Sequence, residues 1–392
     1  MYDMLEAGPA SPRGRPPSPK ECKLRRGLCT ANVSAVYTTG AGYKKTSMVT
    51  GEGLGKRSLD QIPILLALTL LMLISVACGG RVGFDSPGED SLTWGSFSNE
   101  HGTRDYRLYF PSGYEEQGGI PLIVMLHGCR QDAEDFAVGT RMNDVAERET
   151  LVVLYPEQRL DANSLNCWNW FEPFNQERGS GEPSIIAGAT EKVIAEYNID
   201  TDRVYVAGMS AGGALASIMG ATYPNLYAAI GVHSGLEYKA ADDNRAALRV
   251  QKGGGPDPDQ QGYYAFLSAG AEARVLPTLV FHGEDDAVVD VVNAQQTLSQ
   301  WAQTNDYAYD GSDNDDITDE PSDVLREQAP EGYHYARYVY ESPEGNVVME
   351  KWIIKELGHA WSGGDAEGSY ADPRGPDASE EMVRFFGQHP KG

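Results

Sequence analysis

The sequence is poor in positive charge. Its 392 residues hold 32 lysines and arginines against 57 aspartates and glutamates, a formal net charge of −25 at pH 7. Residues 1–77 contain 10 basic and 5 acidic residues, which leaves 22 basic and 52 acidic residues, a net charge of −30, for the rest of the chain. Such a surface repels nucleic acid and favours solubility, so we expect no nucleic-acid partner.

Cysteine and histidine are also scarce. The chain has five cysteines and seven histidines, and they form no cluster with the spacing of a zinc site. A glycine-rich phosphate loop is absent too. The sequence therefore argues against a metallohydrolase, and we expect neither a metal ion nor another cofactor.

The long apolar run near the N-terminus is too short for a comfortable membrane span. Residues 62–77 make about 16 positions, whereas a transmembrane helix needs roughly 20. Lys56 and Arg57 precede the run, and small residues follow it. This order is typical of a secretory signal. A buried core helix is the alternative, but two glycines directly after the run argue against it.

The N-terminal region divides into three predicted parts. Residues 1–47 are rich in proline, glycine and basic residues, and we interpret them as a disordered or misassigned leader. Met48 would give a better-proportioned start. Residues 48–78 then form the signal, residues 79–89 a short linker, and residues 90–388 the folded domain.

The cut site has two interpretations. Cys78 follows small residues, as in a bacterial lipoprotein signal in which this cysteine is lipidated. Ser75 and Ala77 also suit ordinary signal peptidase. Either route exports the domain, so we expect an extracellular or cell-envelope protein that is membrane-anchored only if Cys78 carries lipid.

Two cysteines remain in the exported part. Cys22 and Cys29 lie in the leader and Cys78 at its end, which leaves Cys129 and Cys167. Disulfides persist outside the cytoplasm, so this even pair predicts a disulfide bond. Such a bond would contribute roughly 3–4 kcal/mol. Two separate buried thiols are the alternative.

Residues 90–388 alternate between strand-like and helix-like runs. We predict strands at residues 106–110, 122–126, 151–155, 204–207, 228–232, 278–281, 336–340 and 347–354. We predict helices at residues 135–149, 185–197, 211–223, 293–303 and 377–386. The first strand alternates in polarity and is expected at a sheet edge, while the next ones are continuously apolar. The pattern predicts an α/β fold with a mostly parallel sheet covered on both faces.

An acidic stretch interrupts this pattern. Residues 304–331 carry ten acidic residues and one basic residue. The run from Asp310 to Asp316 offers the oxygen ligands that calcium takes, but it lacks the spacing of a twelve-residue calcium loop. We expect a solvated acidic loop, and calcium binding there is left open.

The run Gly208-Met209-Ser210-Ala211-Gly212 lies between a predicted strand and a predicted helix. This is the pattern of a nucleophile elbow, a sharp turn that exposes a serine hydroxyl. Small residues must flank the serine so that strand and helix can approach. The helix dipole favours negative charge developing at Ser210. Ser210 is therefore the candidate nucleophile.

A serine hydroxyl needs a base, and in this arrangement an acid and then a histidine follow the serine along the chain. His359 lies just after the strand at 347–354, where such a base must sit, whereas His334 lies in a polar stretch and His389 in the tail. The acid is expected after the strand at 278–281. Asp286 is the first choice there, and Asp285 the second.

The oxyanion of an acyl-transfer intermediate needs two backbone donors. The N–H of Ala211, directly after the nucleophile, is the first candidate. The N–H of Cys129, in the loop that follows the strand at 122–126, is the second. Trp168, Trp170 and Trp361 are candidate walls of a substrate pocket, with ordinary packing as the alternative for each.

Five segments together resemble the short polyhydroxybutyrate depolymerase-like esterases, which are related to the feruloyl and acetylxylan esterases of carbohydrate esterase family 1. The segments are residues 126–129, 166–170, 208–213, 282–286 and 358–364. The resemblance also extends to residues 368–379 and to the acidic loop, and so covers most of residues 90–388. It implies an α/β-hydrolase fold, a triad of Ser210, Asp286 and His359, and an oxyanion loop that carries Cys129.

The resemblance leaves the substrate open. We expect a monomeric secreted serine esterase that hydrolyses polyhydroxybutyrate-type polyester or its oligomers. The alternative is a feruloyl or acetylxylan esterase acting on plant polysaccharide. Secreted depolymerases often add a linker and a polymer-binding domain, which are not seen after residues 377–386. A non-catalytic surface-binding lipoprotein is the hypothesis from another class.

Overall fold

The computed structural model describes residues 92–114 and 118–392. The predicted leader at residues 1–47, the signal at 48–78, the linker at 79–89 and the lipidation site Cys78 all lie outside the described residues. Within the described part, no helix combines the length and apolar character needed to cross a membrane.

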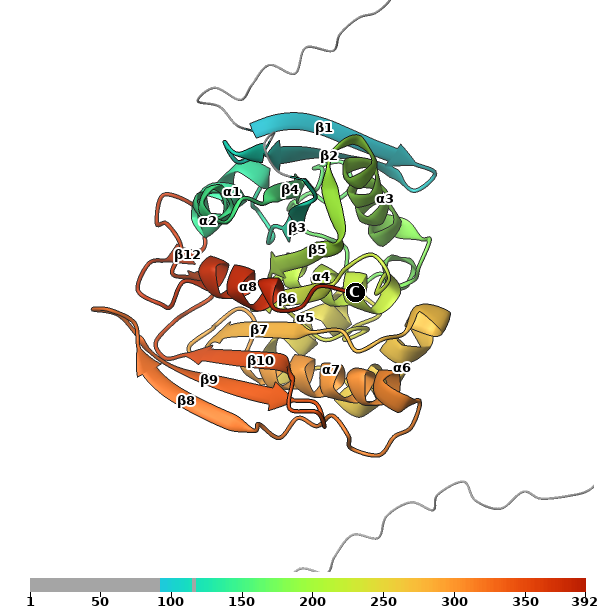
Figure 1. Ribbon diagram of the computed structural model, residues 1–392, viewed down its shortest axis with the longest axis vertical. Coiled ribbons are helices and arrows are strands. Elements are labelled where there is room, and N and C mark those ends of the chain that lie inside the picture. Colours follow the sequence, from blue (N-terminus) through green and yellow to red (C-terminus); the bar gives the residue numbers. More distant parts are fainter. Residues whose placement is uncertain (1–91, 115–117) are drawn as a thin grey trace, which may run out of the picture. The chain divides into compact units, whose positions relative to one another are not determined.

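One large sheet forms the centre of residues 92–392. Its strand order is β1-β2-β4-β3-β5-β6-β7-β10-β9-β8 (Figure 1). The strands are β1 (Leu92–Asn99), β2 (Gly102–Tyr109), β3 (Ile120–Leu126), β4 (Val152–Pro156), β5 (Ile199–Met209), β6 (Ala229–His233), β7 (Thr278–Gly283), β8 (Asp323–Gln328), β9 (His334–Glu341) and β10 (Val347–Ile354). Neighbours from β4 to β10 pair in parallel. The outer strands pair antiparallel.

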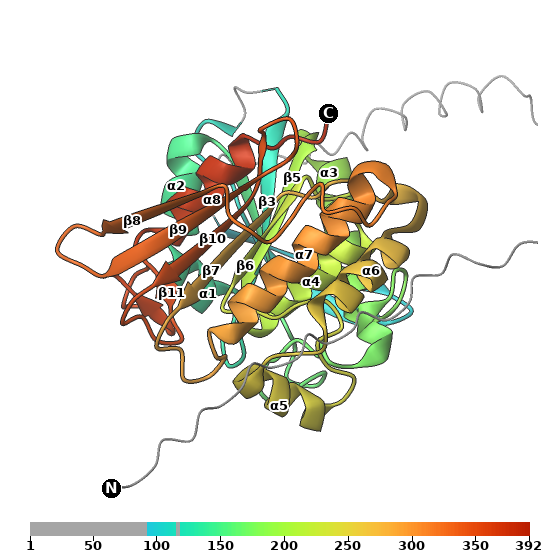
Figure 2. The ribbon, with the colours of Figure 1, turned by 90° about the horizontal axis from the view of Figure 1, so that it is seen from below.

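Helices cover both faces of this sheet (Figures 1 and 2). On one face lie α1 (Ala133–Thr140), α2 (Met142–Glu149) and α8 (Ala378–Gly387). On the other lie α3 (Gly181–Glu196), α4 (Ala211–Thr222), α5 (Asn244–Gly253), α6 (Pro258–Ala269) and α7 (Val292–Asp310). Short 3₁₀ turns occur at Pro173–Gln176 and Gly270–Glu272, and β11 (Trp361–Ser362) pairs with β12 (Ala371–Asp372) outside the main sheet.

Strand β3 shows why the central strands are continuously apolar. Leu122, Val124 and Leu126 belong to the core on the α4 side, while Ile123 and Met125 belong to the core on the α8 side. Successive side chains of a strand point to opposite faces, so a strand between two helix layers must be apolar throughout. The predicted mostly parallel sheet with helices on both faces is confirmed.

Two predictions about elements need correction, and four elements were missed. The strand predicted at 106–110 is not at the edge, because β1 pairs with β2 along its whole length and takes that place. The helix predicted at 135–149 is two helices, since Arg141 adopts a left-handed backbone with φ of 54° between α1 and α2. The strands β1 and β8 and the helices α5 and α6 were not predicted.

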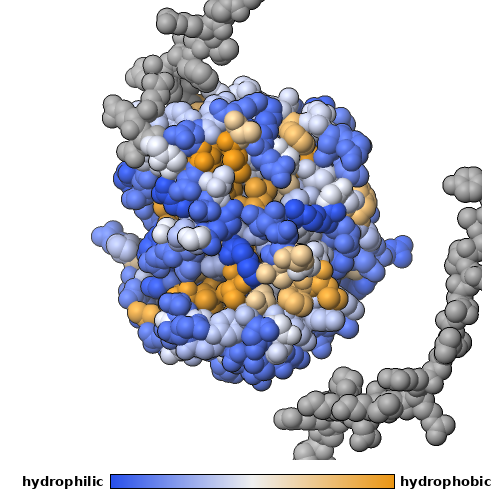
Figure 3. Space-filling view, turned by 45° about the vertical axis from the view of Figure 1, so that its right-hand side comes forward, coloured by the Kyte–Doolittle hydropathy of each residue, from blue (hydrophilic) through white to orange (hydrophobic). Residues whose placement is uncertain are grey.

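The acidic stretch is tied to the domain by one buried carboxylate. Asp306, near the end of α7, is 2% exposed and accepts hydrogen bonds from the backbone N–H groups of Asn314, Asp315 and Ile317. Among the described residues, no three His, Cys, Asp or Glu side chains are grouped so that they could hold a metal ion. Hydrophilic residues dominate the face seen in Figure 3, where apolar residues form separate patches.

Candidate active site

Ser210 occupies a sharp turn between β5 and α4. Its backbone has φ of 57° and ψ of −118°, a conformation that a residue with a side chain adopts only under constraint. The N–H of Ser210 donates to the carbonyl of His233 over 2.9 Å, and its own carbonyl accepts from Ala214 N–H over 2.9 Å. These two bonds hold the serine in the strained turn.

Glycines around Ser210 let three backbones meet. A Cβ added to Gly212 would collide with the carbonyl of Leu126, and one added to Gly208 would collide with the carbonyl of Gly212. A Cβ on Gly128 would lie 3.5 Å from the Cβ of Ser210. The loop after β3 therefore lies directly against the serine.

His359 and Asp286 come from neighbouring strand ends and form a hydrogen bond. Asp286 follows β7 and His359 follows β10, and 2.7 Å separates His359 Nδ1 from Asp286 Oδ2. An ionised carboxylate can only accept, so Nδ1 is the donor, and in the neutral ring Nε2 is then the acceptor. This is the tautomer that a general base requires.

Asp286 is buried and well partnered. Its Oδ1 accepts from the N–H groups of Val288 and Val289, each over 2.8 Å. Burial alone would raise its pKa, but the hydrogen bond from His359, the charges of His359 and His282, and the Val289 N–H together lower the pKa below 3.8. Asp285, the second choice, is exposed to solvent.

The two other candidate bases lie elsewhere. His334 is exposed at the start of β9. His389 contacts the carbonyls of Phe385 and Val347, both over 2.7 Å. Neither lines the space around Ser210.

Ser210 and His359 open onto one cleft of about 440 Å³. Both aliphatic or aromatic side chains and polar side chains line this cleft. The lining comprises Gly128, Cys129, Arg130, Gln131, Leu165, Cys167, Trp170, Phe171, Met209, Ser210, Asn244, Ala247, Leu248, Gln251, Val288, His359 and Tyr370. The cleft can therefore receive a substrate much larger than an acetyl group at the serine.

Only one of the three predicted tryptophans lines this cleft. Trp170 does, whereas Trp168 and Trp361 do not, so the prediction that they wall the pocket is corrected. Trp168 is fully buried and donates from Nε1 to the carbonyl of His127 over 3.1 Å. Trp361 is 1% exposed and donates to Ser379 Oγ over 3.1 Å. Both indoles pack behind the loops that form the cleft.

The two predicted oxyanion donors lie beside the serine. Ala211 is the first residue of α4, so its N–H has no partner inside the helix. Cys129 lines the cleft, and its N–H donates to no protein acceptor in residues 92–114 and 118–392. Both donors are available to a developing oxyanion.

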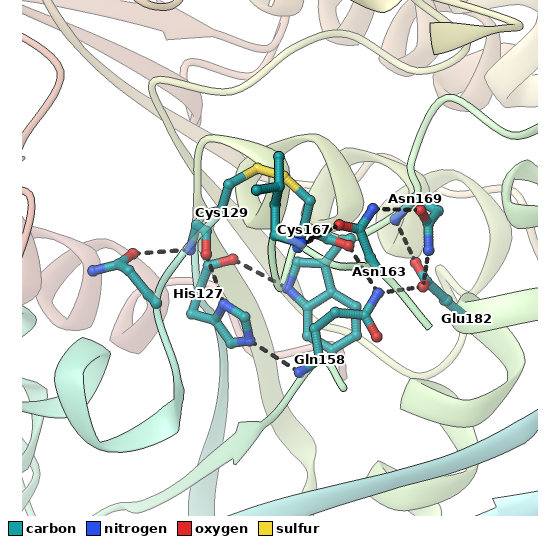
Figure 4. The surroundings of a disulfide bond; sticks show 11 residues. His127, Cys129, Gln158, Asn163, Cys167, Asn169 and Glu182 are labelled. Carbon is teal, nitrogen blue, oxygen red and sulfur yellow. Dashed lines mark hydrogen bonds between the residues drawn. A yellow bond between two sulfur atoms is a disulfide. The ribbon is translucent and has the colours of Figure 1, made fainter. Parts of the chain in front are cut away.

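A disulfide joins Cys129 to Cys167 and links the loop after β3 to the loop after β4 (Figure 4). Behind it lies Glu182, in the first turn of α3. Its carboxylate accepts from Asn169 N–H over 2.7 Å, from Asn169 Nδ2 over 2.8 Å and from Gln158 Nε2. Gln158 Nε2 also donates to the carbonyl of Cys167 over 2.9 Å. The cysteine-bearing loop is thus pinned from both sides.

Several residues of the site had not been predicted. Gln131 accepts from Gly128 N–H over 2.9 Å and donates to the carbonyl of Ser369 over 3.0 Å. Leu248 and Val288 line the cleft from α5 and from the loop after Asp286. The one sequence signal that could have indicated Gln131 is its position two residues after Cys129.

Comparisons with known proteins define the fold and the family of this chain. The structure is similar to the acetyl xylan esterase from Aspergillus awamori, with a TM-score of 0.59 and 19% identity, covering 76% of this chain and 99% of that one. This likeness and the sheet order define an α/β-hydrolase fold. The chain matches the esterase PHB depolymerase family over residues 104–317, more than half its length, and belongs to that family.

Curated relatives carry different substrate names. Poly(3-hydroxyalkanoate) depolymerase C of Paucimonas lemoignei is 30% identical over 271 residues, covering 67% of this chain and 60% of that protein. Feruloyl esterase B of Neurospora crassa is 29% identical over 238 residues, covering 59% and 79%. Acetylxylan esterase A of Emericella nidulans is 32% identical over 214 residues, covering 52% and 68%. The chain thus spans about 60% of the length of the depolymerase.

Proposed function

We propose that the protein hydrolyses carboxylic esters through a covalent acyl-enzyme. Ser210 is the nucleophile, His359 the general base and Asp286 the carboxylate that orients it. The observation that carries this proposal is the hydrogen bond between His359 Nδ1 and Asp286, on the same cleft as the strained Ser210. Membership of an esterase family supports the same chemistry.

The reaction follows from the placement of these groups. His359 Nε2 takes the proton of Ser210 Oγ as that oxygen bonds to the ester carbonyl carbon. The carbonyl oxygen becomes an oxyanion that accepts hydrogen bonds from Cys129 N–H and Ala211 N–H. Losing one such donor typically raises the barrier by about 3–4 kcal/mol. His359 then protonates the departing alkoxide, and afterwards activates the water that releases the acid.

A hydroxyalkanoate polyester or its oligomers is the substrate class we propose. The depolymerase relative supports it. So does the apolar rim of the cleft, where Leu165 and Leu248 are more than half exposed and Val288 and Tyr370 are partly exposed. Methyl-branched aliphatic ester units would cover this rim, which an acetyl group at the serine would leave in water.

A feruloyl or acetylxylan ester is the second candidate. Two relatives bear these names. The polar lining residues Arg130, Asn244 and Gln251 favour it, because sugar hydroxyls need such hydrogen-bond partners.

The chemistry is tested by Ser210→Ala on a chromogenic short-chain ester. We expect activity to vanish, since the acyl-enzyme cannot form. Ser217→Ala is the matched control, because Ser217 lies on α4 and its buried hydroxyl has no partner in the described structure. Retained activity in Ser210→Ala would refute the assignment. Failure of the wild type to react at Ser210 with a fluorophosphonate probe would instead favour the non-catalytic binding protein.

The substrate class is tested by comparing kcat/KM on hydroxybutyrate oligomers, methyl ferulate and acetylated xylan. The polyester proposal expects the oligomers to be preferred. A preference of tenfold or more for either plant-type ester would overturn it in favour of the second candidate.

We further propose that the protein acts outside the cytoplasm. The signal-like residues 48–78 and the Cys129–Cys167 bond, which an oxidising compartment preserves, support this. The mass of the mature N-terminus tests it: a diacylglyceryl adduct on Cys78 indicates lipid anchoring, and an unmodified N-terminus directly after the apolar run indicates free secretion. A mature chain that still contains residues 62–77 would contradict export through this signal.

A further inference from the structure

Three buried histidines lie beneath the cleft and have no role in the proposed reaction. His127 follows β3, His233 ends β6 and His282 lies at the end of β7. All three side chains are fully buried. Each hydrogen-bonds to the backbone of a different loop of the site.

His127 holds the loop with the oxyanion donor. Its Nε2 accepts the N–H of Gln158 over 3.0 Å, so the other nitrogen, Nδ1, carries the proton and donates to the carbonyl of Gly128 over 2.7 Å. A trans peptide points its C=O and N–H in opposite directions. With the Gly128 carbonyl held by His127, the N–H of Cys129 is turned away from the interior, towards the cleft.

His233 holds the loop with the general base. Its Nε2 accepts the N–H of Ser362 over 3.1 Å, three residues after His359, and its Nδ1 contacts Ser234 Oγ over 3.2 Å. The imidazole stacks between Phe281 and Trp361, with ring centroids 5.8 and 4.8 Å away. Its own carbonyl accepts the N–H of Ser210. One residue therefore contacts both the nucleophile turn and the base loop.

His282 holds the loop with the acid. Its Nε2 donates to the carbonyl of Val289 over 2.8 Å and lies 3.5 Å from Asp286 Oδ2. Val289 in turn donates its N–H to the other oxygen of Asp286. The turn that presents Asp286 is closed by this histidine.

We propose that His127, His233 and His282 are positioning residues, each fixing one of the three loops around Ser210 through a backbone hydrogen bond. The inference rests on the proposed esterase function and assigns no chemical step to these histidines.

The neutral imidazole is required at two of these positions. The imidazolium form has no acceptor, so protonation would break the bonds from Gln158 N–H to His127 and from Ser362 N–H to His233. Burial lowers the pKa of His127 to about 4, and burial with the nearby His282 and His359 holds the pKa of His233 well below 6.5. The negative charges of Asp132 and Asp135 raise the pKa of His127, and that of Asp286 raises the pKa of His233. In both cases the lowering of the pKa by burial is larger.

His233→Phe tests the proposal most directly, because phenylalanine keeps the stacking between Phe281 and Trp361 but removes the acceptor for Ser362 N–H. We expect kcat on a chromogenic ester to fall about tenfold to a hundredfold, with KM within about threefold, as the base shifts by a fraction of an ångström. His233→Gln places an amide oxygen near the position of Nε2 and should recover most of kcat. His389→Phe is the control, a histidine with two backbone contacts away from the cleft.

A folded His233→Phe enzyme with wild-type kcat would overturn the proposal. So would a larger loss of kcat in His233→Gln than in His233→Phe, which would mean that ring packing and not the hydrogen bond to Ser362 N–H matters. An inactive wild type would instead refute the esterase function itself, so the two failures are distinguishable.

The wild-type pH profile gives a second measurement if His233→Phe does not fold. The acid limb of log kcat should steepen from a slope of one towards two near pH 4, as His127 is protonated in addition to the base. His127→Gln cannot titrate and should restore a slope of one. A wild-type limb that keeps unit slope while the protein stays folded would overturn the role of His127.

Discussion

Asp286 uses its two carboxylate oxygens for two different tasks. One oxygen accepts from His359 Nδ1, and the other accepts the N–H groups of Val288 and Val289. The same side chain thus fixes both the tautomer of the base and the shape of its own loop. Its lowered pKa favours the ionised carboxylate, the form that accepts from His359 Nδ1.

Asp286→Asn should therefore lower kcat roughly 10³- to 10⁴-fold. The amide oxygen would keep the bonds from Val288 and Val289 N–H, so the N–H₂ group would face His359 Nδ1 and favour the tautomer with the proton on Nε2. Steady-state kinetics on a soluble ester measures the effect, with Asp285→Asn as the control because that neighbour is exposed. Equal losses in both variants would mean that Asp286 is not the orienting acid.

Glu237 is a second unusual carboxyl, placed after β6 and 3% exposed. Neither of its oxygens has a partner among the described residues, and burial with the nearby charge of Asp257 raises its pKa to about 9. In the unfolded chain it ionises near 4.5. Between these values the unfolded state binds fewer protons, so this group lowers stability as the pH rises.

Glu237→Gln should remove that loss. We expect the variant to gain about 3 kcal/mol of unfolding free energy at pH 7 and about 1 kcal/mol at pH 5, since each pH unit is worth 1.36 kcal/mol. Urea denaturation of both proteins at the two pH values measures it. A gain that does not depend on pH would contradict the raised pKa.

At the residue scale, the sequence predicted which candidate site residues lie together better than it predicted which residues line the cleft. Ser210, Asp286 and His359 each follow a predicted strand, and parallel strands bring such positions to one edge of the sheet. Trp168 and Trp361 were misplaced because closeness in sequence to Cys167 or His359 does not fix which way an indole points. Only the packing of their loops turned both inward.

At the scale of elements, α5 forms one wall of the cleft. Its buried side chains anchor it to the core, while Leu248 on its outer face is 63% exposed and lines the cleft. The backbone N–H of Asp290 donates to the carbonyl of Gln251 over 2.7 Å, which ties α5 to the loop after Asp286. This helix is therefore held in fixed relation to the loop that carries Asp286.

Leu248→Asn should weaken binding of hydroxybutyrate oligomers without changing the KM for a small chromogenic ester. Partial burial of a leucine is worth about 1 kcal/mol, which corresponds to roughly a fivefold rise in KM. Leu267→Asn on α6 is the matched control, since that leucine is 53% exposed and lies outside the cleft. Unchanged KM for the oligomer would remove α5 from the substrate site.

Elements missed from the sequence share a physical cause. Strands β1 and β8 lie at the sheet edges, and none of their residues is buried. They therefore lack the apolar pattern that marked the central strands. The break between α1 and α2 depends on a left-handed Arg141, which no glycine or proline signals. The alternation of strands and helices was enough to predict the parallel strands at the centre of the sheet, but it did not reveal the two edge strands.

For the molecule as a whole, the Cys129–Cys167 bond is the one covalent link across the described fold. It encloses α1, α2 and β4 and joins residues 38 apart in sequence. Closing such a loop restricts the unfolded chain and stabilises the protein by roughly 3–4 kcal/mol.

Cys167→Ser should lower the unfolding free energy by about that amount and also lower kcat, because the loop with the Cys129 N–H loses its anchor. Urea denaturation and kinetics below the unfolding transition separate the two effects. Wild-type protein treated with a reductant should behave in the same way. Full kcat in folded Cys167→Ser would show that the hydrogen bonds of Gly128 and Gln131 suffice to hold the donor.

The same bond makes residues 129–167 a closed ring, and the ring has an exposed weak point at Leu160, which is 69% accessible. A protease that cuts there would separate no part of the enzyme, because both fragments remain covalently joined through the cysteines. A chain cut at this point would thus keep Ser210 and the loop of Cys129 in one covalently joined molecule. The two fragments would separate covalently only after a reductant had broken the Cys129–Cys167 bond.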